Sequence, residues 1–308
     1  MAGQLTWPYE APEAARPVGP GKRATFSIVI PAYQAAAYVL EAVESALDQT
    51  EPPHEIIVVD DGSTDDTVGA LEPVRGRIAI FQRPHGGLSA AKNYGLERAT
   101  GDFVSFLDAD DVFYPQRLEA IAWLSEQRPD LDILTTEVWV TSRSDGKRLR
   151  EFNFEGNAFA VRDQELEILR RCFVFANAAV RRQSLVTLGG FDLSLPRAND
   201  WDAWMRLLRA GSRVGIVRTP LGEYRQTPGS LTSNRAESLL DRVAVLKKAL
   251  RDARPGTAEH RIITEHLQRV TRRTQREFAK AALRRGAKLG DRMRAAERAL
   301  ALTLGRCY

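Results

Sequence analysis

The chain has 308 residues, of which 44% are hydrophobic and 27% charged, and this composition is typical of a globular protein. No apolar run approaches the roughly 20 residues of a membrane-spanning helix, which argues against such a span. The net charge of +4 hides an asymmetry, because residues 236–308 carry 18 Lys and Arg against 8 Asp and Glu, whereas residues 1–235 carry 26 against 32.

The first segment, residues 1–23, is rich in Pro, Ala and Gly without periodicity, so we expect a disordered leader. Four prolines interrupt it before the apolar core of a secretory signal can form: Pro8, Pro12, Pro17 and Pro20. The two cysteines, Cys172 and Cys307, make a poor disulfide framework and fit a reducing compartment. We therefore expect a cytoplasmic protein.

Residues 26–59 read as a strand, a helix and a second strand. Residues 26–30 are a short apolar run, and residues 36–50 carry apolar side chains at the spacing of an amphipathic helix. Residues 55–59 form a second apolar run. This order predicts parallel pairing of the two strands through a right-handed crossover.

The alternation of strands and helices continues to about residue 141. The expected elements are a strand at 77–82, a helix at 89–99, a strand at 102–107, a helix at 115–127 and a strand at 131–141. Such alternation predicts an α/β domain with a mostly parallel central sheet flanked by helices. Ligands of these sheets bind beyond the carboxyl ends of the strands, so we expect residues 31–33, 60–63 and 108–111 to share one crevice.

Three carboxylates follow the strand that ends at Leu107, namely Asp108, Asp110 and Asp111. Side chains two residues apart on extended backbone point the same way, so Asp108 and Asp110 can converge on one point. Crowded carboxylates repel one another unless a cation lies among them, and oxygen ligands favour Mg²⁺ or Mn²⁺ over zinc. The alternative is that these are solvated loop residues before the helix that Pro115 opens.

The second half of the chain is less regular. Residues 165–190 mix helix with apolar loop, a helix that carries Trp201 and Trp204 follows, and residues 214–217 read as a short strand. Residues 236–308 have a helical pattern that breaks near Pro255. The histidines at 54, 85 and 260 lack partners at ligand spacing, so we interpret them as ordinary surface or loop residues.

Two common nucleotide-binding classes are excluded, because no Gly-x-Gly turn follows the first strand and no Gly-Lys-Ser/Thr loop is present. Five blocks instead resemble, in order, those of family 2 glycosyltransferases with the GT-A fold. These blocks are Ser-Ile-Val-Ile-Pro-Ala-Tyr (27–33), Val-Asp-Asp-Gly-Ser-Thr-Asp (59–65), Gly-Leu-Ser-Ala-Ala-Lys-Asn (87–93), residues 101–111, and Gly-Phe-Asp (190–192) through Asp200. The resemblance implies a GT-A nucleotide-diphospho-sugar transferase domain over 24–235 and a basic helical extension over 236–308.

The resemblance assigns the nucleoside of a nucleotide-sugar donor to the first two blocks. The contacts carried over are Pro31, Ala32, Tyr33 and Asp61, with Asp60 beside it. An aspartate can accept the imide N–H of uracil while Tyr33 packs on the base. The alternative is that residues 60–65 are only a turn that caps a helix.

The diphosphate end of the donor is assigned to three further residues. Lys92 matches a basic residue of the family near the donor site and would contact phosphate or base. Asp108 and Asp110 match the Asp-x-Asp element of the family. By that comparison Asp110 binds a Mn²⁺ or Mg²⁺ ion that bridges the phosphates, and Asp108 contacts the ribose or the metal. The ion would act as a Lewis acid on the leaving group.

Asp200 aligns with the general base of the family, which usually follows a glutamate, whereas here Asn199 precedes it. The base would deprotonate the acceptor hydroxyl during a single displacement that inverts the anomeric centre. Helix capping by Asp200 is the alternative, and Asp202 takes the catalytic role if the register shifts by two.

A second departure follows Tyr224-Arg225, where many relatives have x-His and this chain has Gln226-Thr227. This difference puts metal coordination from that loop in doubt. Arg225 or Thr232 is instead expected to contact phosphate.

The expected function is metal-dependent inverting transfer of a sugar, with UDP-sugar the expected donor, to an acceptor hydroxyl in surface polysaccharide or glycolipid synthesis. A catalytically inactive nucleotide-sugar-binding or scaffold protein is the alternative. The basic tail is either a solvated helical face or a peripheral contact with anionic lipid at the inner face of the membrane, near a lipid-linked acceptor. Nucleic-acid binding is not expected because the tail has few aromatic residues. A homodimer is left open.

Overall fold

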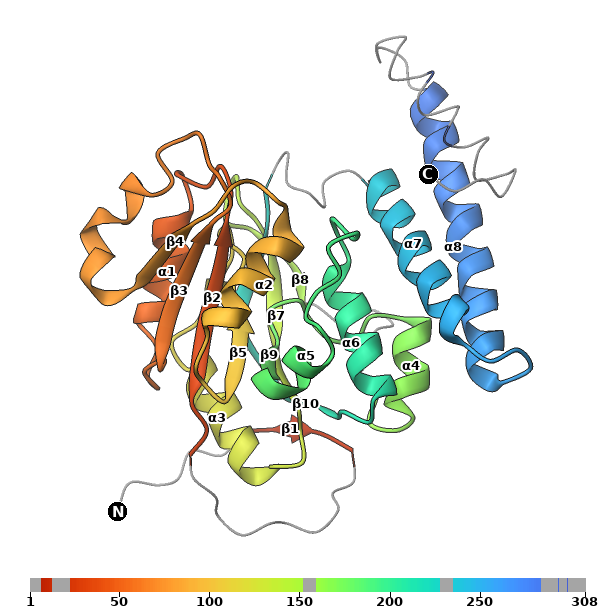
Figure 1. Ribbon diagram of the computed structural model, residues 1–308, viewed down its shortest axis with the longest axis horizontal. Coiled ribbons are helices and arrows are strands. Elements are labelled where there is room, and N and C mark those ends of the chain that lie inside the picture. The colour runs from red at the N-terminus through yellow and green to blue at the C-terminus, as the bar shows by residue number, and fades with distance from the viewer. Residues whose placement is uncertain are drawn as a thin grey trace. The chain divides into compact units, whose positions relative to one another are not determined.

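The computed structural model describes residues 7–12, 23–151, 159–227 and 235–283, together with Met293 and Arg298. The chain divides into two compact units, with the boundary between Thr227 and Pro228. The first unit holds the sheet, and the second is helical (Figure 1).

The first unit is a mixed α/β domain built on one sheet, with the strand order β1-β10-β7-β9-β5-β2-β3-β4 (Figure 1). Two further strands lie off this path, since β6 pairs with β10 and β8 pairs with β7. The strands are β1 (Tyr9–Glu10), β2 (Phe26–Ala32), β3 (Glu55–Asp60), β4 (Ala79–Gln82), β5 (Phe103–Phe106), β6 (Val112–Phe113), β7 (Ile133–Ser142), β8 (Arg148–Glu151), β9 (Ala179–Arg181) and β10 (Val214–Gln226). The helices of this unit are α1 (Val39–Leu47), α2 (Leu88–Arg98), α3 (Arg117–Gln127), α4 (Gln164–Arg170), α5 (Arg182–Thr187) and α6 (Asn199–Arg209), with a 3₁₀ segment at Gly69–Arg77.

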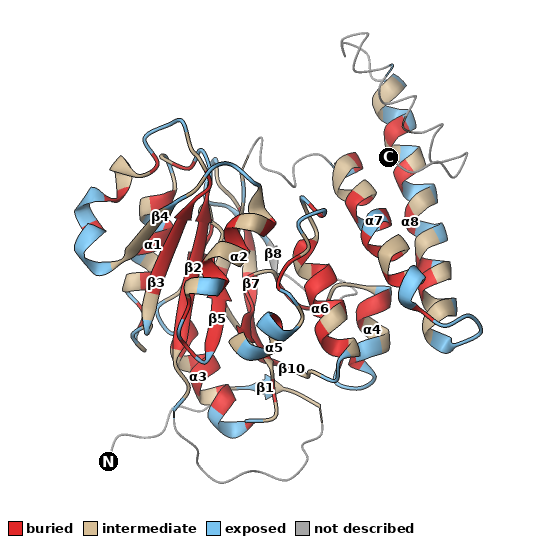
Figure 2. Cartoon of the chain, viewed as in Figure 1, coloured by how far each residue is buried: buried red, intermediate tan, exposed pale blue. Residues whose placement is uncertain are grey.

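The half of the sheet formed by β5, β2, β3 and β4 is parallel, as the alternation of strands and helices predicts. Strands β5, β2 and β3 are nearly continuous runs of buried residues, most of them apolar, because helices cover both faces, whereas the edge strand β4 is only partly buried (Figure 2). In the register, Ala32 lies opposite Asp60 and Val29 lies opposite Phe106. The segments that follow β2, β3 and β5 therefore emerge at one edge of the sheet, which confirms the expected fold class.

Two features of the sheet differ from the sequence-based expectation. Tyr9 and Glu10, placed in a disordered leader, form β1, which pairs with β10, and the Tyr9 ring lies 5.3 Å from that of Trp123. A two-residue strand has no periodicity to reveal it. The strand expected at 214–217 continues to Gln226, because register shifts on either side of Pro220 accommodate the proline within the pairing with β7.

Helix α2 approaches β2 closely because residue 95 is glycine. A Cβ atom there would lie 2.3 Å from Cγ1 of Val29, so no side chain fits. On the same helix Ala91 and Leu96 are buried in the core. The close contact fixes α2 beside the carboxyl ends of the strands.

Within the residues described for the second unit, two helices pack on each other, α7 (Arg235–Asp252) and α8 (Ala258–Leu283). On α8 the buried apolar residues Ile263, Val270 and Phe278 follow a helical spacing. Residues 284–292, which carry part of the predicted basic segment, lie outside the described residues. Among the helices that the structure describes, none is long and apolar enough to cross a membrane.

Candidate active site at the carboxyl edge of the sheet

The acidic residues after β5 lie on a tight turn, in which the Asp111 amide donates a hydrogen bond to the Asp108 carbonyl at 3.0 Å. This turn gives the three carboxylates different surroundings. Asp111 is only 1% exposed, whereas 27% of the Asp108 side chain is exposed. Oδ1 of Asp108 is buried and accepts no hydrogen bond, so it is available to a ligand.

The Asp111 carboxylate has a structural role, because protein groups donate hydrogen bonds to it. It accepts hydrogen bonds from Nδ2 of Asn177 at 3.1 Å and from the backbone amide of Arg225 at 2.9 Å. Beneath it, the fully buried Arg117 donates to the Asn177 carbonyl at 2.7 Å. Burial, with the charges of Asp108 and Asp110, raises the pKa of Asp111 well above its usual range. Burial also lowers the pKa of Arg117 to about 9, an effect that Asp111 opposes. Asp111 thus anchors the acidic turn.

Asp110 connects the acidic turn to Thr227, the residue that follows β10. Its Oδ2 accepts a hydrogen bond from Thr227 Oγ1 at 3.0 Å, and its carbonyl accepts one from Arg143 at 3.3 Å. Burial and the neighbouring Asp108 raise the pKa of Asp110. A cation at this point would relieve the repulsion between the two carboxylates.

The donor set fits a divalent ion that shares its ligands with phosphate. In the described ranges no group of three or more His, Cys, Asp or Glu side chains is arranged to hold a metal ion. The acidic turn offers Asp110 and Oδ1 of Asp108, which accepts no hydrogen bond and lies 3.8 Å from the Lys92 ammonium group. Mg²⁺ and Mn²⁺ commonly complete such a pair of carboxylates with phosphate oxygens and water.

Lys92, on α2, lies beside the acidic turn. It is 2% exposed, and its ammonium group is 3.8 Å from Oδ1 of Asp108. The same group lies 5.8 Å from the ring centre of Phe106 and 5.4 Å from that of Phe191. Lys92 is therefore buried beside Asp108 in this structure, and the phosphate or base contact expected for it would have to replace or share that ion pair.

Asp200 is in the first turn of α6 and retains some exposed surface. Protein atoms nevertheless crowd its carboxylate, and this desolvation raises the pKa of Asp200, to which Asp108 adds. The positive charge of Lys92 acts in the opposite direction. A partly exposed carboxylate with a disfavoured charge is suited to accepting a proton.

The two alternatives for this segment find little support in the geometry. The residue before α6 is Ala198, and no side chain caps the helix, so Asp200 is not its cap. Oδ2 of Asp202 accepts a hydrogen bond from Nε of Arg206 at 2.8 Å, and that guanidinium also donates to the Gly190 carbonyl. Asp202 is thus held in a structural ion pair.

The pair Asp60 and Asp61 at the end of β3 is buried and organises two neighbouring segments. Asp60 accepts a hydrogen bond from the Ser63 amide at 3.2 Å, as the turn-capping alternative requires. Asp61 accepts the amide of Gly87 at 2.7 Å and also forms an ion pair with Arg83. A carboxylate and a guanidinium, which are an acceptor and a donor, therefore lie side by side.

Tyr33 is 49% exposed, at the end of the β2 segment whose Pro31 and Ala32 are buried. Its ring centre lies 4.3 Å from that of His85, which also contacts Asp61 at 3.0 Å. The interpretation of His85 as an ordinary surface residue is therefore too simple. The sequence carries no signal for this contact, because it depends on the fold of the loop after β4.

Arg225, expected at phosphate, is held by two carboxylates in this structure. It lies 2.7 Å from Oε1 of Glu41 and 3.2 Å from Oε2 of Glu223. Although burial opposes it, these partners raise the pKa of Arg225. Arg143 joins the same cluster at 3.3 Å from Glu41, so the cluster connects α1 to β10 and to the turn that follows β7.

The comparisons with known proteins begin with a family model. The model described as glycosyl transferase family 2 matches residues 27–189, more than half of the chain. Chondroitin synthase of Escherichia coli is 31% identical over 191 residues, which is 60% of this chain and 26% of that protein. The putative teichuronic acid biosynthesis glycosyltransferase TuaG of Bacillus subtilis is 29% identical over 214 residues, 68% of this chain and 82% of that protein. The chain spans only 26% to 59% of the first six curated relatives that it matches.

Solved structures share the fold. The complex of S. aureus TarS 1–349 with UDP matches with a TM-score of 0.64 at 23% identity, over 90% of this chain and 83% of that one. The mannosyltransferase PcManGT from Pyrobaculum calidifontis, in complex with GDP-Man and Mn²⁺, matches with a TM-score of 0.58 at 20% identity, over 97% and 84%.

The raised pKa of Asp200 predicts a stability gain from its removal. Because the unfolded value is about 3.9, the wild type loses stability as the pH rises from there through the folded pKa. Asp200→Asn escapes this loss, so it should unfold at a higher temperature than the wild type near neutral pH. The gain should shrink as the pH falls toward about 4. Thermal unfolding followed by circular dichroism over this pH range measures both effects.

Asp202→Asn is the matched control, because it breaks the ion pair with Arg206 and should lower the unfolding temperature at neutral pH. An Asp200→Asn variant that is less stable than the wild type at neutral pH would contradict the conclusion that desolvation raises the pKa of Asp200.

Proposed function

This chain belongs to glycosyl transferase family 2, and on that premise we propose that it transfers a sugar from a nucleoside diphosphate donor to an acceptor hydroxyl. One observation carries the proposal. Buried Lys92 lies 3.8 Å from Asp108 of the acidic turn, and its charge also acts on Asp200 of α6. Asp108 offers a ligand for a metal and diphosphate, and Asp200 offers a base for the incoming hydroxyl.

The donor that we propose is a UDP-sugar. A uracil ring presents an N–H donor between two carbonyl acceptors, which the neighbouring Asp61 and Arg83 complement. The exposed Tyr33 ring can pack on the base. The TarS structures with UDP and with UDP-GlcNAc support this choice, whereas PcManGT, with GDP-Man, shows that the fold also occurs with another base.

The cofactor that we propose is Mn²⁺ or Mg²⁺, held by Asp110 and Asp108. When bound, the ion supplies a Lewis acid for the leaving diphosphate. Thr227, at the position where many relatives have histidine, donates its hydroxyl to Oδ2 of Asp110. That hydrogen bond orients the carboxylate and leaves Oδ1 for the ion.

Asp200 is the residue that we propose as the general base. Its ionised form is required for accepting a proton, and the charge of Lys92 favours that form. One carboxylate suffices for a direct displacement, which inverts the anomeric configuration. The names of the relatives, chondroitin synthase and TuaG, support surface polysaccharide or glycolipid as the acceptor class. We assign this chemistry to residues 24–235.

The donor site predicts a nucleotide-specific stabilisation. UDP with Mn²⁺ should raise the unfolding temperature of the wild type, because a ligand at a hundredfold excess over its Kd adds about 2.7 kcal/mol. Asp110→Ala should abolish the part that depends on Mn²⁺, and GDP should stabilise less than UDP. Asp145→Ala, which removes an exposed acid from the turn after β7, is the matched control and should respond like the wild type.

Two outcomes would contradict this proposal. Equal stabilisation by GDP would contradict the proposal that Asp61 and Arg83 recognise uracil. The absence of stabilisation by any nucleotide would contradict the proposed donor site as a whole. Metal-dependent release of UDP from UDP-glucose or UDP-N-acetylglucosamine then separates an enzyme from an inactive nucleotide-sugar-binding protein.

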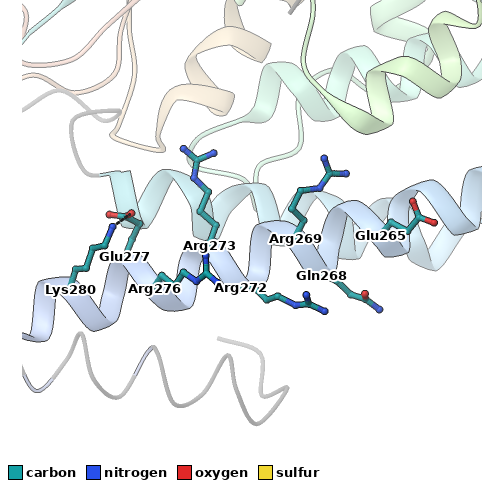
Figure 3. A pocket seen from close by; sticks show the side chains of 8 residues that line it. All are labelled: Glu265, Gln268, Arg269, Arg272, Arg273, Arg276, Glu277 and Lys280. Atoms are coloured by element: carbon teal, nitrogen blue, oxygen red, sulfur yellow. Dashed lines mark hydrogen bonds and ion pairs between the residues drawn. The ribbon is translucent and has the colours of Figure 1, made fainter. Parts of the chain in front are cut away.

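A membrane contact is proposed for the exposed face of α8, where basic side chains gather along a shallow depression (Figure 3). Arg269, Arg272 and Arg276 recur every three or four residues, and among the described residues none of them forms an ion pair. Nearby, Lys280 pairs with Glu277 at 3.1 Å. Unpaired arginines on one face suit anionic lipid headgroups, which would place the enzyme near a lipid-linked acceptor.

Vesicle flotation tests this contact. The full chain should float with vesicles of phosphatidylcholine and phosphatidylglycerol but not with phosphatidylcholine alone. Replacing Arg269, Arg272 and Arg276 with Gln should abolish flotation, at about 1 kcal/mol per arginine. A variant with Arg75, Arg77 and Arg162 changed to Gln loses the same charge elsewhere and should still float. Equal flotation of the two variants would refute the proposed contact.

A further inference from the structure

A buried hydrogen-bond chain joins the start of α6 to the start of α2. Nδ2 of Asn199 donates to Oγ of Ser89 at 2.9 Å, and that hydroxyl donates to the Leu195 carbonyl at 2.9 Å. Asn199 is 2% exposed and Ser89 is 3% exposed, so water does not replace these bonds readily. The donors and acceptors in these two bonds are fixed, because the Ser89 hydroxyl donates its proton to the Leu195 carbonyl and so can only accept from Asn199.

The start of α6 depends on this bond because its own capping is weak. Ala198 precedes the helix with φ of +52°, a left-handed conformation that costs energy for alanine, and no side-chain cap is formed. The side chain of Asn199 anchors the first turn to α2 instead. Asp200 is the next residue, so the position of its carboxylate depends on that anchor.

Helix α2 carries Lys92 one turn after Ser89, and a second anchor follows directly. Asn93 donates to the Phe191 carbonyl at 2.8 Å and accepts the Phe191 amide at 2.7 Å. Gly190 permits this contact, because its φ is +72° and a Cβ there would lie 2.4 Å from Oδ1 of Asn93. The two anchors hold both ends of the segment 190–199 against α2. Of the two, the bond from Asn199 lies nearer to Asp200 in the chain.

We propose that Asn199 and Ser89 are positioning residues for Asp200, and that their hydrogen bond holds its carboxylate beside Lys92, facing the incoming hydroxyl. This inference rests on the proposed function, in which Asp200 is the base. It also explains why this chain has an amide where the family pattern has glutamate. Since Ser89 already donates to Leu195, its oxygen can only accept, and an ionised carboxylate at position 199 has no proton to donate.

Asn199→Asp tests the proposal with almost no change of shape, because it replaces the amide donor by a carboxylate oxygen, and it also adds a negative charge beside Asp200. Ser89→Ala removes the acceptor without adding charge. Each variant should lower kcat for UDP release from UDP-glucose or UDP-N-acetylglucosamine with Mn²⁺ by about 10- to 100-fold, because small misplacements of a reacting group cost that much. The Kd for UDP with Mn²⁺, measured by calorimetry, should stay within about twofold of the wild type, since neither residue contacts the donor site.

The double variant Ser89→Ala, Asn199→Ala should lose no more kcat than Ser89→Ala alone, because both changes break one bond. Gln164→Glu is the matched control for a lost buried amide donor, since Nε2 of Gln164 donates to the Val214 carbonyl at 2.9 Å. That variant should lose stability and keep kcat within about twofold of the wild type.

The outcomes separate the two levels of the account. A wild type without turnover overturns the proposed function and this inference with it. A wild type that turns over, with Ser89→Ala unchanged in kcat or with Gln164→Glu equally impaired, overturns only the positioning role. Additive losses in the double variant would also overturn it.

Discussion

The buried ammonium group of Lys92 is the interaction on which the rest of the site depends. It lies 3.8 Å from Asp108, and its charge opposes the effect of desolvation on the pKa of Asp200. Lys92 is carried by α2, which lies very close to the sheet because Gly95 has no side chain beside Val29. The packing of α2 on the sheet thus helps to place Lys92 next to the acidic turn.

The three aspartates of the acidic turn have the same side chain, but their different surroundings suit them to different roles. Asp111 is buried on Asn177 and on a backbone amide, so it stabilises the turn. Asp110 shares one oxygen with Thr227 and keeps the other for a ligand. Asp108 has an oxygen without a hydrogen bond. Asp108 and Asp110 are therefore suited to a metal and phosphate, whereas the buried Asp111 fixes the turn that positions them.

The sequence predicts well what periodicity and chain order control. The runs at 26–30 and 55–59 and the helices between the strands were enough to predict a mostly parallel sheet and its ligand-binding edge. Contacts between residues far apart in the chain leave no such pattern. The bond between Ser89 and Asn199 spans 110 positions, and the contact of Tyr33 with His85 depends on the loop after β4. Both required the three-dimensional structure.

A crystal structure of the protein with UDP and Mn²⁺ would decide between these assignments, because the anomalous signal of manganese locates the ion without assumption. We predict manganese on Asp110, uracil against Tyr33 with hydrogen bonds to Asp61 and Arg83, and the β-phosphate beside Asp108 and Lys92, with Asp200 open to the acceptor. Manganese away from Asp110, or a diphosphate bound at Asp200, would contradict this arrangement.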